Sequence, residues 1–264
     1  MTGWCKLYVK DSSDMGEVAD ESVQLIITVP SDVVLVKPVE KFSPTSQNNI
    51  RLLQSLGAFA YANISGVFKE CYRVLKPDGL FFFNIGQSGR DWSDYIANAT
   101  PPNCLLPFFA ACRILLDTSF KLQIVFIMIK TKVGNKLNYI KCMNVLQRHE
   151  YWFMFSKSDY WKQYLSEDHT VVTTFSAESS RPANKVPAAW DEQAIEQMIK
   201  MFSKEGDLLL DPMAGTGTLG KVAIAFNRNC ILYDNNEKMR EIIKSKVGTV
   251  IIEEPKHESS SPYK

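Results

Sequence analysis

The sequence lacks the residue patterns of a metal centre or of a disulfide framework. Its 264 residues include six cysteines and three histidines. No two cysteines form a C-x-x-C pair, and the histidines lie far from one another along the chain, whereas zinc sites and disulfide-rich domains need closely spaced ligands or paired cysteines. We therefore expect no bound metal, and we expect free thiols, as is usual in a reducing cytoplasm.

A strong net charge and a long apolar run are also missing. Lysine and arginine number 30 against 29 acidic residues, so the net charge of +1 gives no overall field that favours nucleic acid or a membrane. The longest apolar run, residues 124–129, is strand-sized, whereas a membrane-spanning helix needs about 20 apolar residues. Because the N-terminal residues also lack the basic-then-apolar order of a signal peptide, we expect a cytoplasmic protein without membrane contact.

Short apolar runs alternate with helical patterns along the chain. We expect helices at residues 62–79 and 191–204, and strands at 6–9, 23–28, 80–85, 122–129, 151–155, 207–210 and 230–233. This alternation predicts an α/β sheet. Polar residues gather at 34–56, 86–104 and 157–186, which we expect to be loops that carry substrate contacts.

A glycine-containing loop follows the apolar run at 207–210. Its glycines allow a tight turn and a close approach to a ligand, and the helix that begins near Gly217 offers free N–H donors. The next apolar run ends at Asp234, whose carboxylate can accept hydrogen bonds from both hydroxyls of a ribose. The pattern predicts a site for a ribose-bearing cofactor, with a loop formed by Asp211, Pro212, Met213, Ala214, Gly215, Thr216, Gly217 and Thr218.

Two cofactors of this kind compete for the loop. The spacing Gly215-x-Gly217-x-x-Gly220, with Asp234 about 20 residues on, also satisfies the dinucleotide fingerprint, so a nicotinamide-dependent oxidoreductase is one alternative. However, Asp-Pro precedes the loop and only 30 residues follow Asp234, too few for the further strands of a dinucleotide domain. S-adenosylmethionine (SAM), in a sheet completed by strands from earlier in the chain, is therefore favoured, and a purely structural turn is the third interpretation.

Five segments in the same order resemble the permuted (beta-class) DNA amino-methyltransferases, which modify N4 of cytosine or N6 of adenine. The resemblance covers almost the whole chain and rests on KDSSDMGEVADESVQLIIT at 10–28, FKECYRVLKPDGLFFFNIG at 68–86, RHEYWFMFSKSD at 148–159, ESSRPANKVPAAWDEQAIEQMI at 178–199 and DPMAGTGTLG at 211–220. In the family's loop a phenylalanine usually stands at the position of Met213. The resemblance implies a Rossmann-like, mostly parallel, seven-stranded SAM-dependent methyltransferase sheet in circularly permuted motif order.

The resemblance also implies a role for several residues and a division of the chain. It places Asp11 beside the adenosine, Asp234 on the ribose, residues 211–217 against the cofactor and Trp190 at its methionine end. Residues 1–264 would form one methyltransferase domain, with a catalytic half at about 1–156, a target-contact segment at about 157–186, a SAM-binding half at about 187–253 and a polar tail at 254–264. DNA is the implied substrate, in a restriction-modification setting, and a homodimer or a partner methyltransferase subunit is the implied assembly.

The catalytic loop departs from the family pattern of Ser, Asn or Asp followed by Pro-Pro and an aromatic residue. In the family the polar side chain and the first proline's carbonyl accept hydrogens from the exocyclic amine, which localises its lone pair for attack on the methyl group. The aromatic ring stacks on the flipped base. Here the loop reads Val29-Pro30-Ser31-Asp32, so only the Pro30 carbonyl is retained, because Val29 has no acceptor and Asp32 has no ring.

Three interpretations of this loop stay open. Ser31 or Asp32 takes over the acceptor role; or the loop no longer performs chemistry, and the chain is a silent partner that binds SAM or DNA; or the methyl acceptor is different, such as RNA or protein. A related ambiguity concerns aromatic residues. Tyr151, Trp152, Tyr160 and Trp161 are candidates for the wall of a base pocket, but we expect the alternating Tyr151, Phe153 and Phe155 to be core-facing strand residues.

Overall fold

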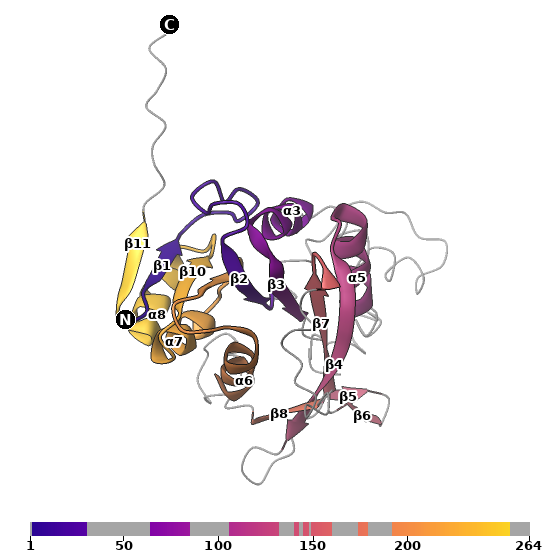
Figure 1. Ribbon diagram of the computed structural model, residues 1–264. Helices are drawn as coiled ribbons and strands as arrows, with labels where there is room; N and C mark the ends of the chain where they lie inside the picture. Colours follow the sequence, from indigo (N-terminus) through magenta and orange to yellow (C-terminus); the bar gives the residue numbers. More distant parts are fainter. Residues whose placement is uncertain are drawn as a thin grey trace, which may run out of the picture.

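The computed structural model describes residues 2–30, 64–84, 106–131, 140–142, 145–147, 149–159, 174–178 and 192–253. Its centre is a nine-stranded sheet (Figure 1). In chain order the strands of this sheet are β1 (Cys5–Tyr8), β2 (Val23–Thr28), β3 (Leu75–Asn84), β4 (Lys121–Thr131), β7 (His149–Ser156), β8 (Thr174–Glu178), β9 (Leu208–Asp211), β10 (Asn229–Tyr233) and β11 (Val250–Glu253). A separate two-stranded sheet joins β5 (Ile140–Cys142) and β6 (Val145–Gln147).

The order of the strands mixes the two ends of the chain. Across the large sheet it is β11-β1-β10-β9-β2-β3-β7-β4-β8. β7 is antiparallel to both of its neighbours, and the other neighbouring pairs are parallel. The late strands β9 and β10 therefore lie between the early strands β1 and β2, as expected for a sheet that the N-terminal half completes.

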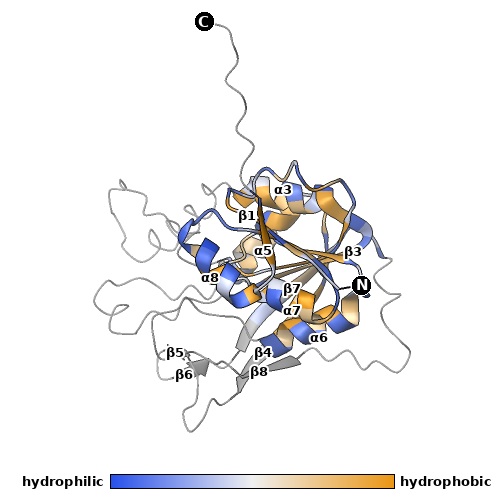
Figure 2. Ribbon diagram, turned by 90° about the vertical axis from the view of Figure 1, so that its left-hand side faces the viewer, coloured by the Kyte–Doolittle hydropathy of each residue, from blue (hydrophilic) through white to orange (hydrophobic). Residues whose placement is uncertain are grey.

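Helices cover both faces of the sheet. On one face lie α6 (Glu192–Phe202), α7 (Thr218–Ala225) and α8 (Lys238–Val247), and on the other lie α3 (Ile64–Val74) and α5 (Leu106–Asp117) (Figure 1). The strands are mainly apolar and the covering helices carry both polar and apolar residues (Figure 2). This is the composition expected when a sheet is buried on both faces.

Strand β3 shows how the core divides into two clusters. Leu80 and Phe82 pack in the cluster on the α6 face, whereas Phe81 and Phe83 pack in the cluster on the α3 face. All four are fully buried, and each phenylalanine buried in this way contributes about 1.5–3 kcal/mol relative to an exposed one. Because β3 is buried on both faces, its apolar residues are consecutive. This continuous run is the signal by which the strand is recognised in the sequence.

The α/β sheet is confirmed, but the sheet has nine strands rather than seven. Each of the seven apolar runs forms a strand, and the two additional strands, β11 and β8, lie at the edges. An edge strand is held by backbone pairing on one side and needs no continuous apolar run. β8 has the polar sequence TFSAE and interrupts the expected loop at 157–186. Two helices, α5 and α8, were also not expected.

Helix α3 ends earlier than the sequence suggested. Its buried residues follow the expected helical spacing, but the helix stops at Val74 and β3 begins at Leu75, before Pro77. A proline disfavours helical backbone in the residue before it. A Cβ at Gly79 would lie 2.8 Å from the Leu75 side chain and 3.0 Å from the Gln24 carbonyl, so glycine permits the close contact of β3 with β2.

Within the part of the chain that the structure describes, we find no helix with the length and apolar character to cross a membrane.

Candidate functional site

The residues singled out in the sequence meet at one edge of the sheet. Strands β1, β10, β9 and β2 are adjacent and parallel, so their carboxyl ends lie at the same edge. Tyr8 pairs with Tyr233, Leu232 pairs with Asp211, and the Asp234 N–H donates to the Tyr8 carbonyl at 3.2 Å. In open α/β sheets, ligands bind outside these carboxyl ends.

The glycine loop leaves β9 in a tight turn that depends on two glycines. The Ala214 N–H donates to the Tyr233 carbonyl at 2.8 Å, and the Gly217 N–H donates to the Ala214 carbonyl at 2.8 Å. Gly215 and Gly217 have φ of +52° and +75°, in the left-handed region that other residues adopt only at a cost. Helix α7 begins at the next residue, Thr218, so its free N–H groups lie beside the loop.

Asp234 connects β10 to this loop. Its Oδ2 accepts a hydrogen bond from the Gly215 N–H at 2.8 Å, and its Oδ1 accepts one from the Asn236 N–H at 2.9 Å. A carboxylate offers about four lone-pair sites, so each oxygen retains capacity to accept a ligand hydroxyl. One side chain can thus order the loop and bind a ribose.

Asp211 is the most strongly perturbed carboxyl group of this edge. It is buried, and burial raises its pKa to about 7; the Met213 N–H, at 3.0 Å from Oδ1, and the Thr28 hydroxyl act in the opposite direction, while the nearby Asp234 adds to the increase. Burial also raises the pKa of Asp234. Two carboxyl groups with raised pKa values at the end of adjacent strands are typical of a functional site.

The loop predicted to be catalytic begins directly after β2. Thr28 and Pro30 are buried, and Val29 is half-buried, with its side chain packed against the core cluster on the α6 face. Val29 therefore serves the packing of the core. The other two residues of the predicted loop, Ser31 and Asp32, lie outside the described residues, and so does Trp190.

Asp11 lies in the segment that connects β1 to β2. It is exposed, and its Oδ1 accepts a hydrogen bond from the Ser13 N–H at 2.7 Å. The carboxylate thus stabilises a turn at the same edge as Asp234. Met213, where the family's phenylalanine usually stands, is half-buried and packs against the cluster on the α3 face.

Sequence reasoning missed Lys246, which reaches the glycine loop from α8. Its Nζ donates to Thr218 Oγ1 at 2.7 Å and to Thr216 Oγ1 at 3.2 Å, and burial lowers its pKa. No signal in the sequence indicates this contact, because about 30 residues separate the partners and lysine is common at the end of a helix.

The aromatic residues of β7 belong mostly to the core. Phe153 and Phe155 are buried in the cluster on the α3 face, Tyr151 packs against it, and Trp152 is buried on the opposite face. The interpretation of Tyr151, Phe153 and Phe155 as core-facing strand residues is confirmed. Trp152 is also a core residue, while Tyr160 and Trp161 lie outside the described residues.

A mostly parallel sheet with helices on both faces, and a glycine loop at the carboxyl end of a central strand, defines a Rossmann-like α/β protein. Residues 59–245 match the model of the N6/N4 DNA methylase family, and the chain belongs to that family. The function expected from the sequence, methylation of an amino group in DNA, is confirmed at this level.

Individual relatives agree over nearly the whole chain. The type II methyltransferase M.MjaI of Methanocaldococcus jannaschii is 24% identical over 290 aligned residues, which cover 92% of this chain and 91% of the relative. A solved structure from Thermus thermophilus, described as a candidate DNA modification methylase in complex with S-adenosyl-L-methionine, superposes with a TM-score of 0.62 at 18% identity, covering 95% and 99% of the two chains. The cytosine-N4-specific PvuII DNA methyltransferase gives a TM-score of 0.62 at 18% identity, covering 96% of each chain. These superpositions confirm the methyltransferase fold.

The geometry of the loop predicts that its two glycines differ in their tolerance of a side chain. A Cβ at Gly217 would lie 3.0 Å from Ile243 Cγ2, whereas nothing lies within 4 Å of a Cβ at Gly215. Left-handed backbone lowers the free energy of unfolding by about 1–2 kcal/mol in both alanine variants. In Gly217→Ala, overpacking against Ile243 lowers it by about 1–3 kcal/mol more. We expect urea unfolding to show a clearly larger loss for Gly217→Ala. Gly206→Ala, with φ of +85° and open space, is the control, and equal losses in all three variants would contradict the prediction.

The raised pKa of Asp211 predicts a stability that falls with rising pH. The unfolded chain releases this proton near pH 4, whereas the folded chain keeps it up to about pH 7. The folded state therefore binds more protons between these values, and the free energy of unfolding decreases as the pH rises through them. Urea unfolding at pH 5, 6, 7 and 8 should show a shallower decrease for Asp211→Asn, with a residual slope from Asp234. Parallel curves for the variant and the native protein would show that Asp211 does not titrate in this range.

Proposed function

We propose that this DNA methylase uses SAM as its methyl donor and that its motifs follow the circularly permuted order. The observation that carries the proposal is the hydrogen bond at 2.8 Å between Asp234 and the Gly215 N–H, because it combines a ribose acceptor with a glycine loop. The position of β9 and β10 between β1 and β2 supports the permuted order. The Thermus thermophilus structure with bound S-adenosyl-L-methionine supports the choice of cofactor.

The residues of the sheet edge fit this cofactor. A backbone with open space around Gly215 lets a ligand approach the loop, and the half-buried Asp234 retains acceptors for two ribose hydroxyls. We assign residues 211–217 to the methionine side of the cofactor, Asp11 to the adenosine side and Trp190 to the methionine end. When bound, SAM supplies a methyl group on a sulfonium centre, which an amine can attack.

The catalytic loop is the weak part of the proposed site. Pro30 retains the carbonyl that would accept one amine hydrogen, but Val29 is committed to packing against the α6-face cluster. Loss of one preorganised acceptor costs about 10²–10³ in rate. We propose that Ser31 or Asp32 provides the second acceptor, and that an amino group of cytosine or adenine is the target.

A second candidate function follows from the same observation. Because Val29 serves the core, the chain can bind SAM, DNA or both without transferring a methyl group, as a silent partner of another methyltransferase subunit. A homodimer is the alternative assembly. A different acceptor, RNA or protein, is the remaining variant. Since M.MjaI is named a type II methyltransferase, we propose a restriction-modification setting for either candidate.

We also propose that residues 1–264 form a single methyltransferase domain. The catalytic half, at about 1–156, and the SAM-binding half, at about 187–253, contribute adjacent strands to one sheet, which supports this division. The segment at about 157–186 would contact the target, and residues 254–264 would form a polar tail.

Calorimetric titration with SAM tests the cofactor assignment. We expect saturable binding, weakened about 10- to 100-fold by Asp234→Ala, because two charge-assisted hydrogen bonds to the ribose are lost. The control is Glu196→Ala, which removes a surface carboxylate paired with Lys200 on α6 and should leave the affinity unchanged. Absence of heat with both SAM and its demethylated product in the native protein would refute the proposal.

Rebuilding the family's catalytic loop separates the active from the silent candidate. The triple variant Val29→Ser, Ser31→Pro, Asp32→Tyr restores an acceptor side chain and a stacking ring. In an assay with tritiated SAM and mixed-sequence DNA, the silent candidate predicts that the incorporated label rises about 10²-fold or more, whereas the active candidate predicts that the native chain already labels DNA. The variant Ser31→Pro, Asp32→Tyr, which keeps Val29, is the matched control. If the native chain already labels DNA as strongly as the triple variant, the silent candidate is wrong.

A further inference from the structure

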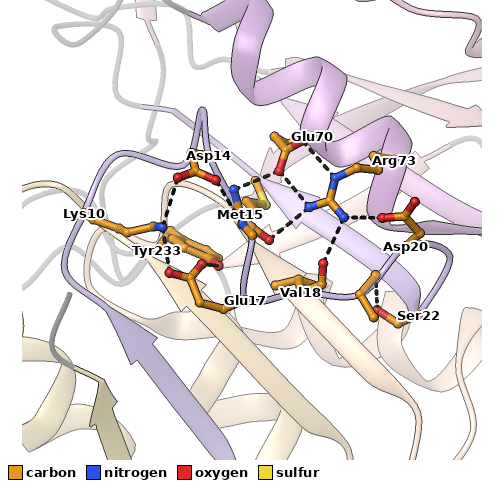
Figure 3. Close-up of polar contacts among 12 residues, drawn as sticks. Lys10, Asp14, Met15, Glu17, Val18, Asp20, Ser22, Glu70, Arg73 and Tyr233 are labelled. Atoms are coloured by element: carbon orange, nitrogen blue, oxygen red, sulfur yellow. Dashed lines mark hydrogen bonds and ion pairs between the residues drawn. The ribbon is translucent and has the colours of Figure 1, made fainter. Parts of the chain in front are cut away.

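The segment between β1 and β2 has no helical or strand hydrogen bonds of its own, and helix α3 holds it in place. Residues 9–22 contain turns but no helix or strand. Two side chains of α3, Glu70 and Arg73, form hydrogen bonds with the backbone of this segment (Figure 3). Arg73 Nη2 donates to the Met15 carbonyl at 2.9 Å, and Arg73 Nη1 donates to the Val18 carbonyl at 3.0 Å. Glu70 Oε2 accepts from the Met15 N–H at 2.8 Å.

The two side chains are themselves locked together. Arg73 Nε lies 2.9 Å from Glu70 Oε1, and Nη2 lies 2.7 Å from Oε2, which is the bidentate geometry of a strong ion pair. The hydrogen bonds from Arg73 hold the pKa of the Glu70 carboxyl below its usual range, so the pair stays ionised at neutral pH. Arg73 also binds the carboxylate of Asp20.

Backbone hydrogen bonds and core packing also attach the segment to α3. The Glu21 N–H donates to the Arg73 carbonyl at 3.1 Å, and the Ser22 N–H donates to the Val74 carbonyl at 2.9 Å. Met15 and Val18 are buried in the cluster on the α3 face. The segment is thus anchored to α3 through side chains, backbone and core packing together.

The opposite side of the same segment contacts the cofactor edge. Tyr233 donates its hydroxyl to Glu17 Oε2 at 3.1 Å, and Lys10 Nζ donates to Glu17 Oε1 at 2.7 Å (Figure 3). Tyr233 also stacks on Tyr8, with ring centroids 5.1 Å apart, and it is the residue directly before Asp234. Residues 10–20, which include Asp11, therefore bridge α3 and the ribose-binding end of β10.

We infer that Arg73 and Glu70 are positioning residues for the adenosine side of the cofactor site. They act through their hydrogen bonds to the backbone of Met15 and Val18, which set the segment that carries Asp11 against β10. A segment without regular backbone hydrogen bonds adopts many conformations when it is free. Fixing it before the ligand arrives reduces the conformational entropy that is lost on binding. The inference rests on the proposed function, because it takes SAM as the ligand.

The test compares Arg73→Met with a variant that removes a similar ion pair elsewhere. Arg113 pairs with Asp117 at 2.7 Å on α5, so Arg113→Met also deletes one helical arginine from a carboxylate pair. Both variants should lower the melting temperature. Only Arg73→Met should weaken SAM binding, by about tenfold. Arg73→Lys, which keeps the charge but cannot form the fork to Glu70 and both carbonyls, should fall between the native protein and Arg73→Met.

Hydrogen exchange without SAM separates the anchoring of the segment from the identity of the ligand. We expect Arg73→Met, but not Arg113→Met, to accelerate exchange of the backbone amides in residues 13–22. Accelerated exchange together with weakened SAM binding supports the inference. Unchanged exchange, or accelerated exchange with native SAM affinity, overturns it. If the native protein binds no SAM at all, the proposed function fails and the positioning role fails with it, and the exchange result still reports whether Arg73 holds the segment.

Discussion

The hydrogen bond from the Gly215 N–H to Asp234 is the contact on which the site depends. It joins the loop after β9 to the end of β10, and both strands are central and parallel. Because the loop has left-handed backbone at Gly215 and Gly217, a partner outside the loop is needed to select this conformation. A carboxylate at the end of the neighbouring strand meets that need and leaves lone pairs for a ligand.

The two-sided core makes this contact possible by fixing the strand ends. Apolar residues of β3 pack alternately against α6 and against α3, so the sheet is held from both faces. On one face α8 approaches the loop closely enough for Lys246 to bind Thr216 and Thr218. On the other, α3 holds the segment of Asp11. The loop and the segment are therefore supported from opposite faces of the same sheet.

The sequence predicts the parts of this structure that depend on local pattern. Central strands are buried on both faces, so β2 and β10 could be recognised as apolar runs, and the glycine loop could be recognised from Gly215, Gly217 and the acidic residue that follows the next run. The edge strand β8, with the polar sequence TFSAE, could not, because backbone pairing places no demand on its side chains. The other edge strand, β11, does contain a short apolar run, Val250-Ile251-Ile252, which the sequence reasoning did not assign to the sheet. Contacts such as Arg73 to Val18, between residues 55 apart, carry no local signal at all.

On the proposed assignment, Val29 separates the chemistry of the site from its cofactor residues. The position after β2 has two possible uses: an acceptor side chain directed at the substrate, or an apolar side chain directed at the α6 face, where Val29 packs. A single residue cannot do both, since a polar group placed in that cluster would lose its hydrogen bonds to water. The proposed cofactor residues Asp211, Gly215 and Asp234 lie instead at the ends of β9 and β10. On the proposed assignment, binding the cofactor and using it depend on different strand ends.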